Sequence, residues 1–298
     1  MQKTIMGLAV DVAIVTAYVE FWAETSVFRR QEAYRLTTET NDQGLSYGVG
    51  KINAKGAFTA EIRIAPRIGL EDIWEGQYGG AQVMGKRPGM YIKYLPTKYH
   101  PINGDMLTGG CYLFDTLENA KGYEHWTTNE FEVGEPKTTY WKQPLFKHVD
   151  SFVWNVIGAH NFTPVEDHGI GRFQRWTYHH VGVEAILKQL YPVLKDGAER
   201  RGACSFWLLH RPEDKMIGIH MSFPKPEDGD HEALREEVED IAREGSVADV
   251  FPDALEVEVL LDRTSIYYAV WQPLAQGDGV KVTSPNFPDI AKASNGAA

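Results

Sequence analysis

Alternation of apolar and polar residues is the clearest pattern along the chain. Between residues 57 and 65, apolar side chains at even positions alternate with polar ones, which is typical of a strand with one buried face. Residues 182–200 instead place apolar side chains three or four positions apart, which predicts a helix with one apolar stripe. The same two periodicities recur through most of the chain.

The predicted elements follow the order strand, helix, strand, strand, helix, strand, and this order occurs twice. The first unit comprises strand 57–65, helix 69–84, strand 90–94, strand 110–114, helix 116–130 and strand 151–160. The second comprises strand 171–178, helix 182–200, strands 203–210 and 215–223, helix 230–243, and strands near 255–262 and 265–272. Residues 95–108 are predicted to form a long loop. Asp115 is expected to cap the helix that follows it.

A weak internal repeat supports this division. The run IGLEDI at 68–73 is echoed by VGVEAI at 181–186, and FVWNVI at 152–157 corresponds to SIYYAV at 265–270, both at an offset of 113 residues. The order βαββαβ is that of the ferredoxin-like fold. We therefore predict an α+β fold of two tandem ferredoxin-like units, packed sheet to sheet as an α/β barrel.

The units define four segments of the chain. These are an N-terminal extension (1–55), a first unit (56–165), a second unit (166–275) and a C-terminal tail (276–298). Residues 6–22 are largely apolar but contain Asp11 and Glu20, so we expect an amphipathic or core-docked helix there, neither a secretory signal nor a membrane span.

The amino-acid composition limits the classes of molecule that the protein is expected to bind. The chain has 41 acidic and 30 basic residues, a formal charge of −11, and no basic run, which disfavours nucleic acid and anionic membranes as partners. Aromatic residues make up 12% and suit an apolar pocket, so the expected partner is a small apolar or aromatic molecule. A homodimer is left open. The two cysteines, Cys111 and Cys204, are expected to be reduced thiols of a cytoplasmic protein.

One run resembles a known family. The sequence GGCYLFD at 109–115, followed by Leu117, Ala120 and Tyr123, is similar to the third strand and second helix of the dimeric α/β-barrel superfamily, and closest to its YdhR-like monooxygenases. The resemblance implies a tandem chain in which two ferredoxin-like units close one barrel. It also implies enzymes that bind apolar substrates between the sheet and its helices and move protons with His, Tyr or Asp.

Familiar catalytic motifs are absent from the sequence. Residues 80–86 spell G-x-x-x-x-G-K, but Arg87 replaces the Ser or Thr of a phosphate-binding loop. No zinc-protease or CxxC motif occurs, and no metal site is predicted. The run Glu166-Asp167-His168 is interpreted as a polar linker between the units.

Histidines on strands of the second unit are the main candidates for chemistry, because imidazole exchanges a proton near neutral pH. Alternation puts Trp176, Tyr178 and His180 on one face of their strand, and groups His220 with Ser222 on the next. The candidate catalytic residues are His220, His180, His179 and Tyr178. The candidate substrate-binding residues are Trp176, Trp207, Tyr268, His160 and Tyr99, the last in the long loop, which is expected to act as a lid.

Three functions remain open. The first is a cofactor-independent lyase, isomerase, cyclase or monooxygenase acting on an aromatic substrate, with His220 or His180 as general base and Tyr178 as hydrogen-bond donor. The second, which the resemblance implies, is a haem enzyme like the aldoxime dehydratases or chlorite dismutases, with His220 as axial ligand. The third is a non-catalytic carrier of an apolar ligand.

Overall fold

A computed structural model describes residues 49–66, 83–99, 106–134, 136–224, 251, 255–273 and 280–283 of the 298-residue chain. The expected N-terminal helix, the expected helix over 230–243 and nearly all of that over 69–84 lie outside the described residues, as does most of the tail.

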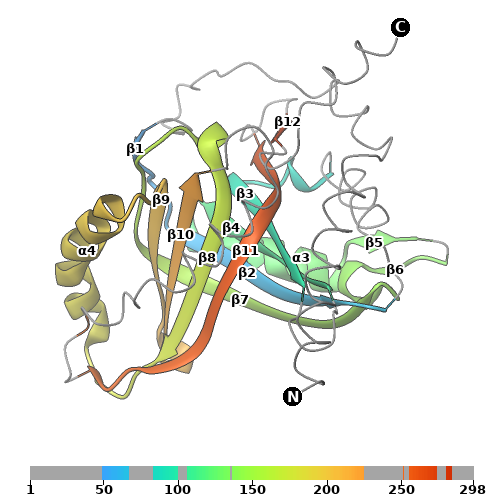
Figure 1. Ribbon diagram of the computed structural model, residues 1–298. Helices are drawn as coiled ribbons and strands as arrows, with labels where there is room; N and C mark the ends of the chain where they lie inside the picture. Colours follow the sequence, from blue (N-terminus) through green and yellow to red (C-terminus); the bar gives the residue numbers. More distant parts are fainter. Residues whose placement is uncertain are drawn as a thin grey trace, which may run out of the picture.

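Eight antiparallel strands form a closed barrel (Figure 1). They are β2 (Gly56–Ile64), β3 (Met90–Tyr99), β4 (Met106–Phe114), β7 (Phe146–Asn161), β8 (His168–Thr177), β9 (Ser205–Arg211), β10 (Met216–Pro224) and β11 (Glu258–Pro273). Short strands β1 (Gly50–Lys51) and β12 (Val280–Thr283) extend β7 and β11, and β5 (Glu132–Val133) pairs with β6 (Thr138–Thr139). Three 3-10 turns are η2 (Tyr140–Lys142), η3 (Val165–Asp167) and η4 (Pro212–Asp214).

The two halves of the barrel have the same strand order. In the first half the order is β7-β2-β4-β3, and in the second it is β11-β8-β10-β9, so the fourth strand of each half lies beside its first. The pairings of β3 with β11 and of β7 with β9 join the halves and close the barrel. The expected barrel is therefore present in the described residues.

Within the described ranges, two helices cover the outside of the barrel (Figure 1). Helix α3 (Leu117–Asn129) packs against β2 and β7, and α4 (Val183–Arg200) packs against β9 and β7. The cap of α3 differs from the expectation. Thr116, not Asp115, is the N-cap, and its Oγ1 accepts a hydrogen bond from the amide of Asn119 at 3.1 Å. Asp115 instead accepts from the Asn119 side chain at 2.7 Å.

Two expectations about strands need correction. The predicted loop 95–108 is partly sheet, because β3 continues to Tyr99 and β4 begins at Met106. The two strands predicted near 255–262 and 265–272 are one long strand, β11, which is bent by bulges between Val259 and Leu261 and between Tyr267 and Ala269.

The core forms three clusters. One lies between the first half of the sheet and α3, and a second between the second half and α4. The third fills the inside of the barrel with side chains from all eight of its strands, among them Tyr94, Trp154, Phe173, Trp207 and Tyr267. The barrel is therefore a packed core along most of its length.

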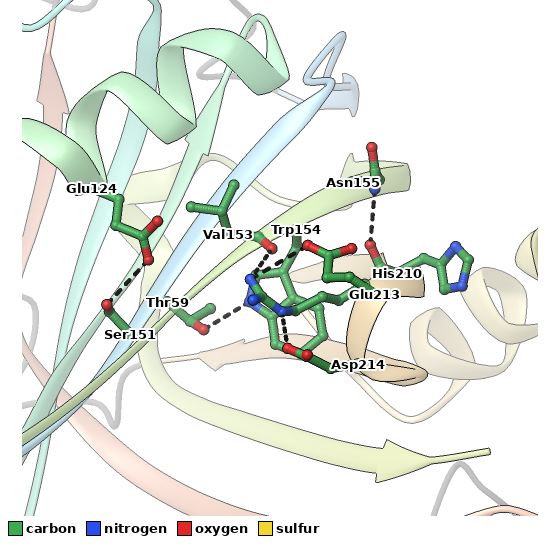
Figure 2. A network of polar contacts seen from close by, with 10 residues as sticks. Thr59, Glu124, Ser151, Val153, Trp154, Asn155, His210, Glu213 and Asp214 are labelled. Carbon is green, nitrogen blue, oxygen red and sulfur yellow. Dashed lines mark hydrogen bonds and ion pairs between the residues drawn. The ribbon is translucent and has the colours of Figure 1, made fainter. Parts of the chain in front are cut away.

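Strand β7 holds the two halves together through side chains as well as backbone (Figure 2). The Trp154 indole N–H donates to Thr59 Oγ1 on β2 at 2.8 Å, while Asn155 Nδ2 donates to the carbonyl of His210 on β9 at 3.4 Å. Both donors come from adjacent residues on opposite faces of β7. This strand therefore contacts both halves of the barrel and fixes the register where they meet.

Candidate functional site

His220 lies inside the barrel and is 1% exposed. It is opposite Phe173 on β8 and Trp207 on β9. Its Nε2 is 2.6 Å from the hydroxyl of Tyr267, and its ring centroid is 4.2 Å from that of Trp207. Tyr94 stacks on the same imidazole at 5.2 Å. His220 is thus part of an aromatic cluster in the centre of the barrel.

A second buried histidine extends this cluster. His168, at the start of β8, is completely buried, and its Nδ1 lies 2.8 Å from the hydroxyl of Tyr94 and 3.0 Å from that of Ser222. Its Nε2 lies 3.3 Å from the carbonyl oxygen of Thr163, so this nitrogen carries the proton and Nδ1 accepts. Ser222 is in turn 2.6 Å from Ser205. The hydroxyls of Tyr94, Ser205 and Ser222 and the ring of His168 thus form a buried hydrogen-bond network.

The protonation states in this cluster follow from burial. Burial lowers the pKa of His220 to about 3, with the neighbouring His168 adding to the effect, and lowers that of His168 to about 4. Burial also raises the pKa of Tyr94 and of Tyr267 far above the ordinary value of 10. Neutral imidazoles and protonated phenols are therefore the stable forms at neutral pH.

This packing does not fit a haem ligated by His220. The Nε2 atom that would coordinate iron is hydrogen-bonded to Tyr267, and the ring is covered by Tyr94 and Trp207. An axial histidine needs free space in front of its ligating nitrogen, large enough to hold the haem macrocycle. The described residues around His220 fill that space, so they do not fit a haem at this position.

Two other predicted residues lie on a different face from His220. Trp176 is buried opposite Ile217 in the cluster under α4. Tyr178 follows on the same face and its hydroxyl is 2.9 Å from His210 Nε2. Placing both in one pocket with His220 was wrong, because Trp176 faces the helix layer and His220 the barrel interior. Trp207, by contrast, does contact His220.

The remaining predicted residues do not gather with His220 either. His179 and His180 are exposed where β8 ends. His160 packs on Phe162 at a centroid distance of 5.2 Å, and burial and Lys195 lower its pKa. The side chains of Tyr99 and Tyr268 lie outside the described residues, so their assignment stays a prediction.

An open cavity occurs at one end of the barrel, at the start of β4, β7 and β11. Its volume is about 540 Å³, within the range of small-molecule sites. It is lined by Glu61, Ile62, Arg63, Leu107, Lys147, His148, Asp150, Leu261 and Arg263. We call this cavity and its lining residues the barrel mouth. Both apolar and ionisable side chains line it, which suits an organic molecule with a polar group.

A largely buried ion pair joins Glu61 of the barrel mouth to Arg175 on β8. Glu61 accepts from Arg175 Nη1 at 2.7 Å, and both side chains are largely buried. The guanidinium carbon of Arg175 lies 4.5 Å from the centroid of the Phe152 ring, and that of Arg211 lies 5.8 Å from the same centroid. A cation held between a carboxylate and an aromatic ring is fixed in position. This pair forms a rigid inner wall to the mouth.

His148 and Asp150 form the most reactive arrangement in the barrel mouth. His148 Nε2 is 2.9 Å from Asp150 Oδ2, and both side chains are about half exposed and line the cavity. A carboxylate only accepts hydrogen bonds, so Nε2 carries the proton and Nδ1 keeps its lone pair. Such a pair can take a proton from a bound molecule at Nδ1 while Asp150 stabilises the imidazolium that results.

Sequence reasoning missed this mouth. The chain was expected to hold no basic patch, yet folding gathers Arg63, Lys147, Arg175 and Arg263 at one end of the barrel. The only local signal was His148 with Asp150 at a spacing of two, which places both on one face of a strand. Within the described residues, no group of three His, Cys, Asp or Glu comes together as metal ligands.

Comparison with known proteins gives limited information. No protein-family model and no curated protein matches the sequence. Among solved structures, a candidate monooxygenase from Fusobacterium nucleatum aligns with 80% of this chain and 97% of its own, at 8% identity and a TM-score of 0.42. One from Lactobacillus acidophilus aligns with 77% and 99%, at 7% and 0.42, and an anthrone oxidase-like protein with 75% and 95%, at 9% and 0.45. Similarities at this level assign neither family nor activity.

No described helix combines the length and the apolar character that crossing a membrane requires.

Proposed function

We propose that this protein is a small-molecule enzyme that moves a proton in the barrel mouth, with His148 as general base. The observation that carries this proposal is that the His148–Asp150 pair, at 2.9 Å, lines a cavity of about 540 Å³ together with Arg263. The acid–base chemistry expected from the sequence is retained, but its place moves from His220 to the mouth.

The step is a proton transfer from a carbon acid. His148 Nδ1 takes the proton from a carbon beside a carbonyl group, and the electron pair of the broken C–H bond moves to the carbonyl oxygen as an enolate. Arg263 stabilises that negative charge, and Asp150 stabilises the imidazolium. Transfer of the proton to another carbon or to the oxygen gives an isomer, whereas its return to the same carbon gives hydrogen exchange; each outcome regenerates neutral His148. No oxidant or cofactor enters this balance.

The interior cluster then has a structural role. The hydrogen bond between His220 Nε2 and the Tyr267 hydroxyl lies away from solvent and helps to keep the barrel closed behind the mouth. The repeated strand order supports the further proposal that the chain consists of two tandem ferredoxin-like units. The names of the similar solved structures point to monooxygenases, whereas the reaction proposed here is derived from the residues of the mouth alone.

Deuterium exchange tests the proton transfer. Phenylpyruvate is a suitable probe because it has an aromatic ring, a carboxylate and an acidic CH₂ group beside a carbonyl. Exchange of its CH₂ protons in D₂O is followed by proton NMR with wild-type protein, with His148→Gln and with His125→Gln. His125 is a matched control because it is also an exposed histidine paired with a carboxylate, Glu130 at 3.2 Å, but lies on α3.

We expect the wild type and His125→Gln to accelerate exchange equally, and His148→Gln to lower the rate by about a hundredfold, within the usual contribution of a general base. Equal rates for His148→Gln and the wild type would refute the role of His148. Saturable binding of phenylpyruvate without any exchange would refute the enzyme and favour the non-catalytic carrier.

A further inference from the structure

Arg263 is a basic residue of the barrel mouth that forms no ion pair within the described part of the chain. Its side chain is partly buried, lines the cavity, and has no hydrogen bond or ion pair to any residue in the described part of the chain. Its Nη2 atom lies over the backbone of Gly109, 3.4 Å from where a Cβ would stand. A guanidinium that is held against the backbone, and whose N–H groups have no acceptor, can donate hydrogen bonds to a bound anion.

Lys98 brings a second positive charge to the same place. It lies on β3 directly opposite Leu107, a lining residue of the mouth, so both are on the inner face of the barrel. Burial lowers the pKa of Lys98, and the nearby Arg263 lowers it further, while Asp262 partly offsets the effect. Lys98 likewise has no ion pair within the described ranges. The two cations therefore repel each other.

Acidic residues nearby are already engaged. Glu61 is bound to Arg175, and Asp150 to His148. Asp262 accepts from Arg172 at 2.7 Å on the opposite face of β11. Neutralisation of Arg263 and Lys98 thus requires a charge from outside the described residues. Leu107 and Leu261 supply apolar surface beside it.

We propose that the barrel mouth binds an organic anion whose oxyanion group, a carboxylate or a phosphate ester, sits between Arg263 and Lys98 while its apolar body packs against Leu107 and Leu261. This inference rests on the proposed function in that it names the substrate class of the same cavity. Binding can nonetheless be measured without turnover.

Calorimetric titration tests the anion site. The probes are phenylpyruvate, its uncharged amide, and phenyl phosphate, each titrated into the wild type, Arg263→Gln and Lys188→Gln. The last variant is the charge-matched control, because Lys188 forms an exposed ion pair with Glu184 on α4, outside the mouth. Circular dichroism melts of all three proteins verify that they are folded.

We expect the wild type to bind phenylpyruvate at least tenfold more tightly than the amide. Arg263→Gln should remove that preference, and Lys188→Gln should keep it. A preference for phenyl phosphate over phenylpyruvate would identify a phosphate ester as the natural group, and the reverse a carboxylate. Equal affinity of the wild type for acid and amide, an unchanged preference in Arg263→Gln, or no binding of either anion would overturn the proposal.

The anion site and the enzymatic reaction fail in different ways. Anion-selective binding that depends on Arg263, without proton exchange, upholds the site and refutes the reaction. Exchange that depends on His148 but proceeds equally with acid and amide upholds the reaction and refutes the site.

Discussion

Acid should destabilise this protein through two buried histidines of the barrel interior. The pKa of His168 is lowered to about 4 and that of His220 to about 3, whereas in the unfolded chain both return to an ordinary value of about 6.5. Between these limits the unfolded chain binds two protons that the native state does not. Stability from these groups is therefore fully present above pH 6.5 and is lost as the pH falls.

The size of the effect follows from these shifts. A pH of about 5 is about 1.5 units below the unfolded-state pKa, so each histidine lowers the free energy of unfolding by about 2 kcal/mol. His168 and His220 together therefore lower it by about 4 kcal/mol relative to neutral pH. Typical domains are stable by only about 5–15 kcal/mol, so this loss is a large share. Burial is the cause in both cases, since both side chains are essentially inaccessible to water.

Urea unfolding near pH 7.5 and near pH 5 measures this loss, and the comparison with variants isolates it from other titrating groups. His220→Phe keeps a ring between Tyr94 and Trp207 but cannot titrate, so its loss of stability between the two pH values should be about 2 kcal/mol smaller than that of the wild type. Exposed His125→Gln should behave as the wild type does. An NMR titration in which His168 or His220 protonates near its ordinary pKa in the native state would refute the reasoning.

Two further predictions concern packing and thiols. Gly171→Ala should lower the melting temperature, because its Cβ would stand 2.4 Å from the Tyr267 ring, and such overpacking typically costs about 1–3 kcal/mol. Gly122→Ala in α3 should raise the melting temperature, because nothing lies within 4 Å of its Cβ and alanine reduces the entropy of the unfolded chain. A melt in which both variants shift the same way contradicts this. Burial raises the pKa of Cys111 to about 12 and Cys204 is equally buried, so a thiol reagent should label neither in the native protein and both in denaturant.

Much of the fold was predictable because strand alternation is a local property. The apolar face of β2 and the stripe of α4 follow directly from spacing, and the repeat at a fixed offset indicated that two halves share one order. The extents of β3 and β4 were not predictable, because prolines, glycines and tyrosines in residues 95–108 favour a loop. Cross-strand hydrogen bonds extend these strands in spite of that composition.

The face of the sheet on which each side chain lies was harder to predict. Alternation on β8 separates Trp176 from its neighbours correctly, but only the pairing of Ile217 with Trp176 shows that this face lies opposite to that of His220. On β11, the bulge after Tyr267 breaks the alternation, so spacing alone does not reveal that Tyr267 contacts His220. A bulge adds one residue and leaves no local signal in the sequence.

The barrel mouth shows a limit of another kind. Its charged residues come from three strands that are far apart in the chain, as Arg63, His148 and Arg263 illustrate. Each, taken alone, reads as a solvated residue near a strand end, and the net charge of −11 argues against anionic ligands. Closure of the barrel brings Arg263 near Lys98, and neither forms an ion pair within the described part of the chain. In the proposed anion site local charge, rather than net charge, selects the ligand, and only the strand register brings these residues together.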